Sequence, residues 1–264
     1  NLARRRPLGV VGVISPFNFP LYLAMRAVAP AIALGNAVVL KPDPRTAVCG
    51  GAVIARLFEQ AGLPAGVLHM LPGDGAAGAA LTSDPHVAMI QFTGSTAACR
   101  KVGEAAGKHL KKVSLELGGK NSLIILDDAD LDLAVANTAW GVYLHQGQIC
   151  MATGRVLVHE KIHAAFLEKL VAKAKSLKVG DPAREDEAIG PLINATPRDH
   201  PARSVADAPR PGSTLAARGP HQALLFAPTS TGHDAVPHPP VHHDPSPAAP
   251  VVRPFVHTPP SSPP

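Results

Sequence analysis

Residues 8–42 read LGVVGVISPFNFPLYLAMRAVAPAIALGNAVVLKP, and this stretch decides the fold. It begins with a β-branched run flanked by glycines, Leu8–Ile14, which is typical of a buried strand. A helix is expected over Pro20–Leu34, opened by a proline and closed by Gly35. A second short strand follows at Ala37–Leu40. Because both strands are continuously apolar, we expect a parallel sheet that helices cover on both faces.

The alternation of strands and helices continues along the chain to residue 177. Further strands are expected at Val67–Leu71, Val87–Phe92, Lys112–Leu117, Leu123–Leu126 and Val156–Val158. Further helices are expected at Ala47–Ala61, Ala76–Ser83, Ala97–Lys108, Leu131–Leu144 and Ile162–Leu177. With right-handed crossovers, this order predicts an α/β fold with a doubly wound, mainly parallel sheet.

Composition limits the class of protein. The 264 residues are 46% hydrophobic and 17% charged, which allows a sizeable core and excludes collagen-like, coiled-coil and wholly disordered chains. The net charge of +5 is spread out, apart from Arg4–Arg6 and Lys108–Lys112, and no aromatic residues interleave with these clusters. We therefore expect no nucleic-acid partner.

The longest apolar run and the cysteines bear on location. Ala27–Leu40 is interrupted by Pro30 and Gly35 and is too short to cross a bilayer, so we expect no membrane association. The cysteines are three and widely spaced, which favours a reduced, cytoplasmic protein over a disulfide framework.

Residues 195–264 differ in composition from the rest. They hold 17 of the 28 prolines and 7 of the 13 histidines. Stretches such as Val236–Pro240 and Thr258–Pro264 are not expected to hold a helix or a sheet ladder, so we expect a disordered Pro/His-rich tail. Its histidines at 233, 238, 242 and 243 lack cysteine or carboxylate neighbours, and no metal site is expected. The abrupt change is also what translation out of frame would produce, which resequencing the gene would settle.

Two residues in the body of the chain are candidates for covalent and acid–base chemistry. Cys150 follows a turn that contains Gly147, and a helix N-terminus at that point would favour the nucleophilic thiolate. A buried structural cysteine is the alternative, and it is the interpretation we keep for Cys49 and Cys99. Glu116 ends an apolar strand, where partial burial would suit it as a general base. A salt-bridged glutamate is the alternative there.

Other candidates follow the remaining strands. The amide of Asn18 can donate to a developing oxyanion, although such an asparagine is more often a turn residue. Lys41 can bind ribose hydroxyls or phosphate, or lie exposed. Residues Phe92–Thr96 pass from a strand to a helix, where backbone amides can hold a phosphate, but the full G-x-G-x-x-G spacing is absent. Leu71–Gly75 is a similar glycine cluster.

Taken together and in this order, the motifs resemble those of the aldehyde dehydrogenase superfamily. They are PFNFP at 16–20, VVLKP at 38–42, FTGST at 92–96, LELGGKN at 115–121 and GQICMA at 147–152. Wider stretches, including KPDPRTA at 41–47, are most similar to the bacterial benzaldehyde and vanillin dehydrogenase branch. We expect the resemblance to cover residues 1–194 and none of the tail.

The resemblance implies a Rossmann-like dinucleotide-binding domain over residues 1–117 and a partial catalytic domain over residues 118–194. Cys150 would attack the aldehyde carbon and give a thiohemiacetal, whose oxyanion the Asn18 amide and the Cys150 backbone N–H would stabilise. Hydride transfer to the nicotinamide would leave a thioester. Glu116 would then activate the water that hydrolyses it to a carboxylic acid.

The resemblance also implies cofactor contacts for NAD or NADP. Lys41 would hold the adenosine ribose, and Ser95 the pyrophosphate. The other implied cofactor residues are Phe17, Gly75, Gly94 and Leu117. Many NAD-preferring relatives have a glutamate three residues after the lysine, but this chain has Pro44 followed by Arg45. Without that carboxylate the 2′-phosphate of NADP is not repelled, so the sequence allows either NAD or NADP as cofactor.

Members of the family are much longer and form homo-oligomers. The strand that mediates subunit contact and the downstream glutamate–phenylalanine motif are missing here, which argues against the same assembly for this chain. The first residue is Asn1, which predicts a fragment or a processed product. We therefore expect an enzyme that oxidises an aldehyde. The similarity to the benzaldehyde and vanillin dehydrogenase branch favours an aromatic aldehyde. The alternative is a truncated, inactive fragment that at most binds dinucleotide.

Overall fold

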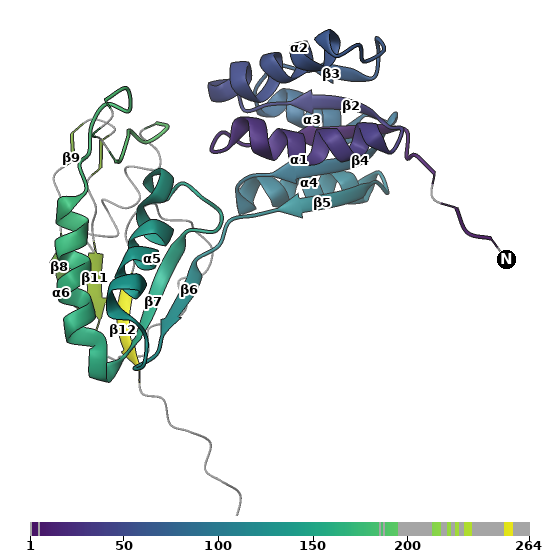
Figure 1. The fold of residues 1–264 in the computed structure, drawn as a ribbon. Coiled ribbons are helices and arrows are strands. Elements are labelled where there is room, and N and C mark those ends of the chain that lie inside the picture. Colours follow the sequence, from purple (N-terminus) through teal and green to yellow (C-terminus); the bar gives the residue numbers. More distant parts are fainter. Residues whose placement is uncertain are drawn as a thin grey trace, which may run out of the picture. The chain divides into compact units, whose positions relative to one another are not determined.

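The computed structural model describes residues 2–4, 6–184, 186 and 188–194, and five later segments: 213–217, 221–222, 225–226, 230–233 and 251–255. The chain divides into two compact units, residues 1–117 and 118–264 (Figure 1).

The first unit is built on a five-stranded parallel sheet. In spatial order its strands are β3 (Leu68–Met70), β2 (Ala37–Lys41), β1 (Val10–Ile14), β4 (Val87–Thr93) and β5 (Lys112–Glu116). Every neighbouring pair runs parallel. The chain order reverses between β1 and β4, which makes this the topological switch point of a doubly wound sheet. The predicted α/β fold is confirmed.

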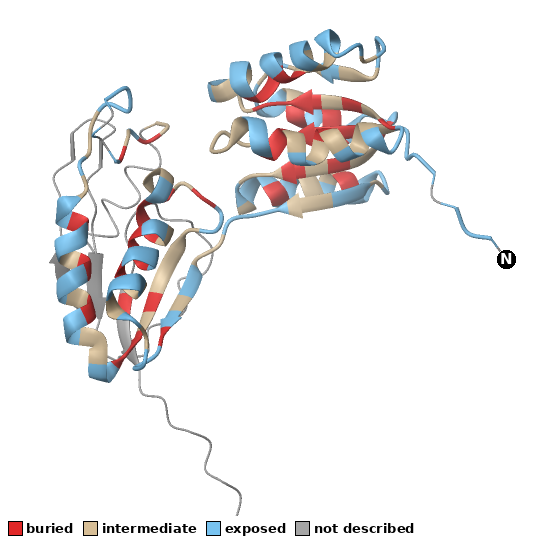
Figure 2. Cartoon of the chain, viewed as in Figure 1, coloured by how far each residue is buried: buried red, intermediate tan, exposed pale blue. Residues whose placement is uncertain are grey.

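Helices cover both faces of this sheet, and the alternating side chains of β1 explain how. Val11 and Val13 pack in one core with α1 (Pro20–Ala33) and α2 (Val53–Gln60). Ile14 packs in a second core on the other face, where α3 (Gly75–Ser83) and α4 (Thr96–Lys108) lie. The buried positions follow the strands between these helices (Figure 2).

One predicted helix differs in its details. The segment expected to form a single helix over Ala47–Ala61 consists of a π-helical turn, η2 (Val48–Ala52), followed by α2, and a 3₁₀ turn, η1 (Pro44–Thr46), precedes it. Gly50 and Gly51 lie against neighbouring prolines, where an added Cβ would stand 2.9 Å from Pro20 and 2.7 Å from Pro42. The widened turn accommodates this close approach.

The second unit contains another five-stranded sheet. Its strands, in spatial order, are β6 (Asn121–Ile125), β7 (Thr153–His159), β12 (Val251–Phe255), β11 (Ser230–His233) and β8 (Ser213–Ala217). Only β8 pairs in the antiparallel sense. A separate antiparallel pair is formed by β9 (His221–Gln222) and β10 (Leu225–Phe226).

The core of the second unit joins this sheet to two helices. These are α5 (Leu131–Tyr143), which the 3₁₀ turn η3 (Leu144–Gly147) follows, and α6 (Glu160–Ser176). Phe166 and Leu170 of α6 are fully buried against Val156 and Val158 of β7. Among the described helices the longest, α6, has 17 residues, and none is long and apolar enough to cross a membrane.

The strands after residue 194 correct the expectation of a disordered tail for the residues that form them. β12 pairs with β7 along five residues, and the Val252 side chain is 0% exposed within the core of the second unit. Two β-branched valines supply that strand, and Pro254 lies past its two-residue pairing with β11. The stretches Val236–Pro240 and Thr258–Pro264, on which the expectation rested, lie outside the described residues.

The burial of Val252 makes the role of β12 testable. We expect Val252→Ala to lower the free energy of unfolding of the full chain by about 2 kcal/mol, because buried methyl groups are lost. Urea denaturation measures this. Val48→Ala is the matched control, since Val48 is 67% exposed and its truncation should change little. Equal, small effects of both substitutions would contradict a buried β12.

Candidate active site

Side chains with chemical potential gather after the carboxyl ends of the parallel strands in the first unit. The loop of Asn18 follows β1, and Lys41 ends β2. Gly94 and Ser95 follow β4, and Glu116 ends β5. Because parallel strands share one carboxyl edge, these residues lie on both sides of the switch point. Ligands of open α/β sheets bind in the crevice at this edge.

Lys41 is a buried cation at this edge. The residue is only 6% exposed. Burial lowers the pKa of its ammonium group, and the nearby carboxylates of Asp43 and Asp74 partly offset this lowering. Within the described structure Nζ donates one hydrogen bond, to the Pro42 carbonyl at 3.2 Å. An ammonium has three N–H donors, so two remain for ligand hydroxyls. That donor set fits the ribose of a dinucleotide.

Arg45 is held in place by two neighbours. Its Nε and Nη2 donate to the Asp43 carboxylate at 2.8 and 2.6 Å, and its guanidinium lies 4.6 Å from the centre of the Phe17 ring. Burial alone would raise the pKa of Asp43, but the hydrogen bonds and charge of Arg45 outweigh it and lower that pKa. The Arg45 guanidinium is therefore already paired with a carboxylate.

Two helix N-termini open on the same edge. Asp74 caps α3, which begins at Gly75, and an added Cβ on Gly75 would meet open space. Ser95 caps α4 by accepting a hydrogen bond from the Ala98 amide at 3.3 Å. An added Cβ on Gly94 would stand 2.7 Å from the Phe92 ring, so the approach to α4 requires glycine. Free amides and the helix dipole make such an N-terminus suitable for a pyrophosphate.

Glu116 differs from its expected environment. Its side chain is 51% exposed, so the expected partial burial is not observed. Its Oε2 lies 3.6 Å from Nη2 of Arg26, which also donates to the Thr93 hydroxyl at 3.4 Å. Glu116 is thus a salt-bridged residue at a strand end, positioned by α1 and β4. Leu117, which follows it, is 40% exposed.

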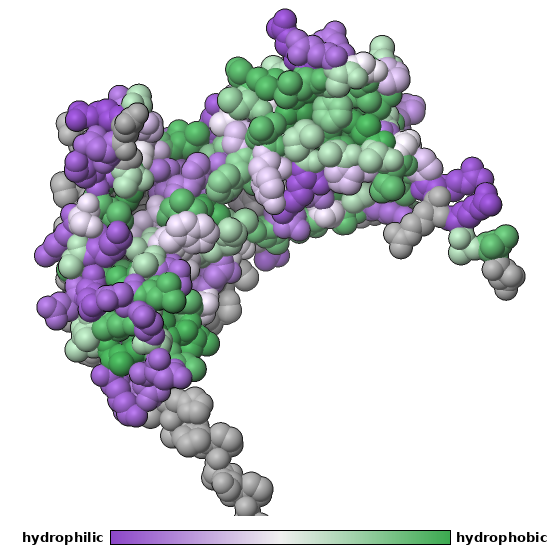
Figure 3. Space-filling model, viewed as in Figure 1, coloured by the Kyte–Doolittle hydropathy of each residue, from purple (hydrophilic) through white to green (hydrophobic). Residues whose placement is uncertain are grey.

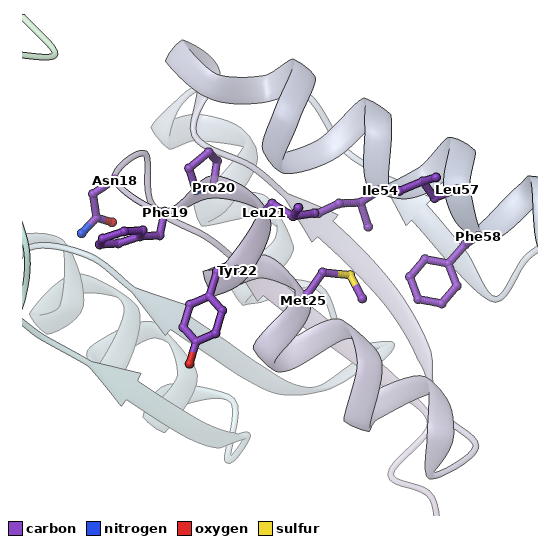
Figure 4. Close-up of a pocket in the computed structure, with 9 residues that line it drawn as sticks. All are labelled: Asn18, Phe19, Pro20, Leu21, Tyr22, Met25, Ile54, Leu57 and Phe58. Carbon is purple, nitrogen blue, oxygen red and sulfur yellow. The ribbon is translucent and has the colours of Figure 1, made fainter. Parts of the chain in front are cut away.

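Asn18 lies at one end of an apolar groove between α1 and α2. The groove, of about 620 Å³, is lined by Asn18, Phe19, Pro20, Leu21, Tyr22, Met25, Ile54, Leu57 and Phe58 (Figure 4). Leu21, Tyr22 and Leu57 are 49%, 68% and 55% exposed. Hydrophobic side chains accordingly gather over these helices at the surface (Figure 3). Asn18 therefore places a polar amide beside aromatic and aliphatic side chains.

Cys150 belongs to the second unit. It is exposed, with a free thiol, in the turn between η3 and β7. No helix begins there, so the expected helix N-terminus is not present at Cys150. The preceding turn, η3, contains three successive left-handed residues, His145, Gln146 and Gly147, with φ of 53°, 58° and 69°. Ile149 beside it is buried and anchors the turn.

Three residues that contact the candidate residues receive no role from the sequence, although Asp43 and Asn121 lie within the quoted motifs. Asp43 could have been found, because an aspartate two residues before Arg45 is typical of a capped turn. Arg26 has no local signal, since its partner Glu116 is distant in sequence. Asn121 donates to the backbone of the Cys150 turn, and a single asparagine after two glycines does not predict that contact. Among the described residues no group of three His, Cys, Asp or Glu side chains could hold a metal ion.

The whole sequence was compared with known families. The sequence profile of the Aldehyde dehydrogenase family matches residues 1–253. The chain belongs to this family. The match overturns the expectation that the resemblance ends at residue 194, and it agrees with the presence of β12 in the second sheet.

Curated relatives of this family member include enzymes named for aromatic aldehydes. A vanillin dehydrogenase from Amycolatopsis sp. is 57% identical over 229 residues, which cover 87% of this chain and 47% of that protein. A benzaldehyde dehydrogenase from Pseudomonas putida, whose name specifies NAD(+), is 53% identical over 229 residues. These residues cover 87% of this chain and 47% of that protein. The chain therefore spans about half the length of the curated relatives it matches.

Solved structures of the family share the fold of this chain. An NAD-dependent benzaldehyde dehydrogenase from Corynebacterium glutamicum aligns with a TM-score of 0.85 at 41% identity, covering 94% of this chain and 55% of that one. The NAD⁺ complex of an aldehyde dehydrogenase from Bacillus cereus aligns with a TM-score of 0.90 at 33% identity, covering 97% and 52%. The Rossmann-like fold of the family is thus present here.

Lys41 provides a test of the cofactor edge. We expect Lys41→Met to weaken NAD⁺ binding at least about tenfold, because a charged hydrogen-bond donor is lost. Stability near neutral pH should stay the same or rise, since a desolvated cation is replaced by an apolar chain. The folded-state pKa of Lys41 lies below its ordinary value of 10.5. The unfolded chain therefore binds the extra proton, and wild-type stability rises with pH between the two values.

The stability advantage of Lys41→Met should consequently shrink as pH rises toward 10.5. Calorimetric binding and chemical denaturation at several pH values measure both effects. Lys101→Met on α4 is a control, since Lys101 is exposed. Unchanged NAD⁺ affinity in Lys41→Met would contradict the assignment.

Proposed function

We propose that this aldehyde dehydrogenase chain carries residues for oxidising an aromatic aldehyde to its carboxylic acid, with a nicotinamide dinucleotide as oxidant. The observation that carries the proposal is an exposed cysteine in a hydrogen-bonded turn of a chain whose doubly wound sheet has candidate dinucleotide-binding residues at its switch point. The aromatic class is supported by the vanillin and benzaldehyde relatives. The apolar groove that begins at Asn18 also supports it.

In the proposed reaction Cys150 is the nucleophile. Its thiolate forms a bond to the carbonyl carbon, and the carbonyl electron pair moves onto oxygen to give a thiohemiacetal. The Asn18 side-chain amide and the Cys150 backbone N–H donate to that oxygen. Donors fixed before the reaction stabilise the developing charge without reorganisation, and one such donor contributes about 10²–10³ in kcat.

The cofactor edge orients the dinucleotide. When bound, the nicotinamide ring would supply the acceptor for the hydride that leaves the thiohemiacetal carbon, and loss of this hydride gives the thioester. Lys41 holds the adenosine ribose, and the N-terminus of α4 at Ser95 holds the pyrophosphate. Gly94 permits its close approach, and Gly75 leaves space on the adenine side. Phe17 and Leu117 complete the contacts.

Glu116 is proposed as the general base for hydrolysis. Its carboxylate takes a proton from water, whose oxygen attacks the thioester carbon and displaces the Cys150 thiolate. The carboxylic acid leaves and the cysteine is restored. Arg26, 3.6 Å from the Glu116 carboxylate, complements its charge and limits its range of positions.

A second candidate function is dinucleotide binding without turnover. It is favoured by one observation: the complete sheet of the first unit carries Lys41, Gly75, Gly94 and Ser95, whereas Cys150 belongs to the other unit. For either function a cytoplasmic location is proposed. The free thiols of Cys49, Cys99 and Cys150 suit a reducing compartment.

The decisive assay is turnover by the purified chain of 264 residues. We expect benzaldehyde with NAD⁺ to give steady formation of reduced nicotinamide, followed by its absorbance. Cys150→Ala should lower the rate roughly 10⁴-fold or more, because the nucleophile is lost.

Cys49→Ala is the control for this assay, since Cys49 is also an exposed thiol. Turnover retained by Cys150→Ala would overturn the mechanism. A folded chain without turnover, whose melting temperature rises with NAD⁺, would establish the second candidate.

The pairing of Arg45 with Asp43 predicts a preference for NAD over NADP. Asp43→Asn should release the guanidinium for a 2′-phosphate and shift the ratio of the two dissociation constants about tenfold toward NADP. Asp84→Asn is the control, because Asp84 precedes β4 at the amino edge of the sheet. Equal ratios in all three proteins, measured by calorimetry, would remove Asp43 from cofactor selection.

A further inference from the structure

The turn that bears Cys150 is held by a side chain outside it. Nδ2 of Asn121, the first residue of β6, donates to the carbonyl oxygens of Cys150 and Ala152, each at 3.1 Å. A primary amide nitrogen carries two hydrogens, so one nitrogen serves both carbonyls. The β6–β7 ladder starts beside this contact, with Asn121 opposite Thr153.

These bonds fix the orientation of the nucleophile's backbone. The Ala152 amide donates to the Ile149 carbonyl at 3.1 Å, which holds the peptide plane that contains the Cys150 N–H. Asn121 holds the next plane, which contains the Cys150 carbonyl. Peptide units are planar, so fixing both planes fixes φ and ψ of Cys150. The direction of its Cα–Cβ bond follows from these angles.

The turn that precedes Cys150, η3, has a costly backbone. His145 and Gln146 adopt left-handed conformations without being glycine. Each such residue costs on the order of 1–3 kcal/mol, and it persists when the surroundings determine it. Gln148 follows η3 directly, and its side-chain oxygen accepts a hydrogen bond from the Ile193 amide at 3.0 Å.

The neighbour of Asn121 packs against the same segment. The Lys120 side chain lies over Gly154, where any added Cβ would overlap it. Burial, and then the charge of Arg155, lower the pKa of the Lys120 ammonium. Lys120 and Asn121 thus attach the start of β6 to the residues on the C-terminal side of Cys150.

We propose that Asn121 is a positioning residue that sets the direction of the Cys150 side chain; this rests on Cys150 being the nucleophile of the proposed function. Asn121 touches the turn through backbone carbonyls, so its effect on the reaction passes through Cys150. Misplacement of a reacting group by about 1 Å can cost ~100-fold in rate.

Two readouts on the full chain test this proposal. We expect Asn121→Ala to speed hydrogen exchange of backbone amides within residues 147–153 about tenfold, while the melting temperature changes little, because the contact is exposed. In turnover with benzaldehyde and NAD⁺, kcat should fall about tenfold or more while KM stays within about twofold. Asn121→Ser keeps one donor and should recover part of both effects.

Asn137→Ala is the matched control, since Asn137 is an exposed asparagine on α5. Exchange in residues 147–153 that is equal in wild type, Asn121→Ala and Asn137→Ala would overturn the proposal, whatever the activity. Equal kcat values despite faster exchange would also overturn it. A wild-type chain without turnover would contradict the proposed function, whereas the exchange readout would still decide whether Asn121 holds the turn.

Discussion

The common direction of the strands in the first sheet is the constraint on which the site depends. Because β1 to β5 all run parallel, every loop that leaves a strand does so at one edge. The loop of Asn18, Lys41, the start of α4 and Glu116 therefore lie along one edge without any long connection between them. Helices on both faces stabilise this arrangement by burying apolar side chains such as Val13 and Ile90.

The same edge includes features that lower stability. Lys41 is desolvated, and a Cβ added at Gly94 would stand 2.7 Å from the Phe92 ring. In the second unit, the turn before Cys150 contains non-glycine residues in left-handed conformations. These departures from favourable local structure coincide with the candidate catalytic and cofactor residues. That coincidence is expected where function, rather than folding, determines the residue.

Much of this could be predicted from local patterns. Apolar runs bounded by glycine and proline identified β1, α1 and β2, because their signals lie within the elements themselves. The motif residues after the strands followed from the same periodicity. Contacts between distant residues could not be predicted: Arg26 with Glu116, and Asn121 with the Cys150 turn, depend on pairings across the fold. The strand β12 was not expected because prolines dominate the composition around it, while Val252 occupies a core position that pairing with β7 creates.

The position of β12 has a consequence for biosynthesis. All strands of the first sheet are available once Glu116 has left the ribosome, so that unit can fold while translation continues. The second sheet differs, because β7 must wait for residues 251–255 before its other edge is paired. During that interval a nascent chain exposes the edge and the apolar faces of β7 and α6. Chaperone contact during synthesis would therefore concentrate on the second unit.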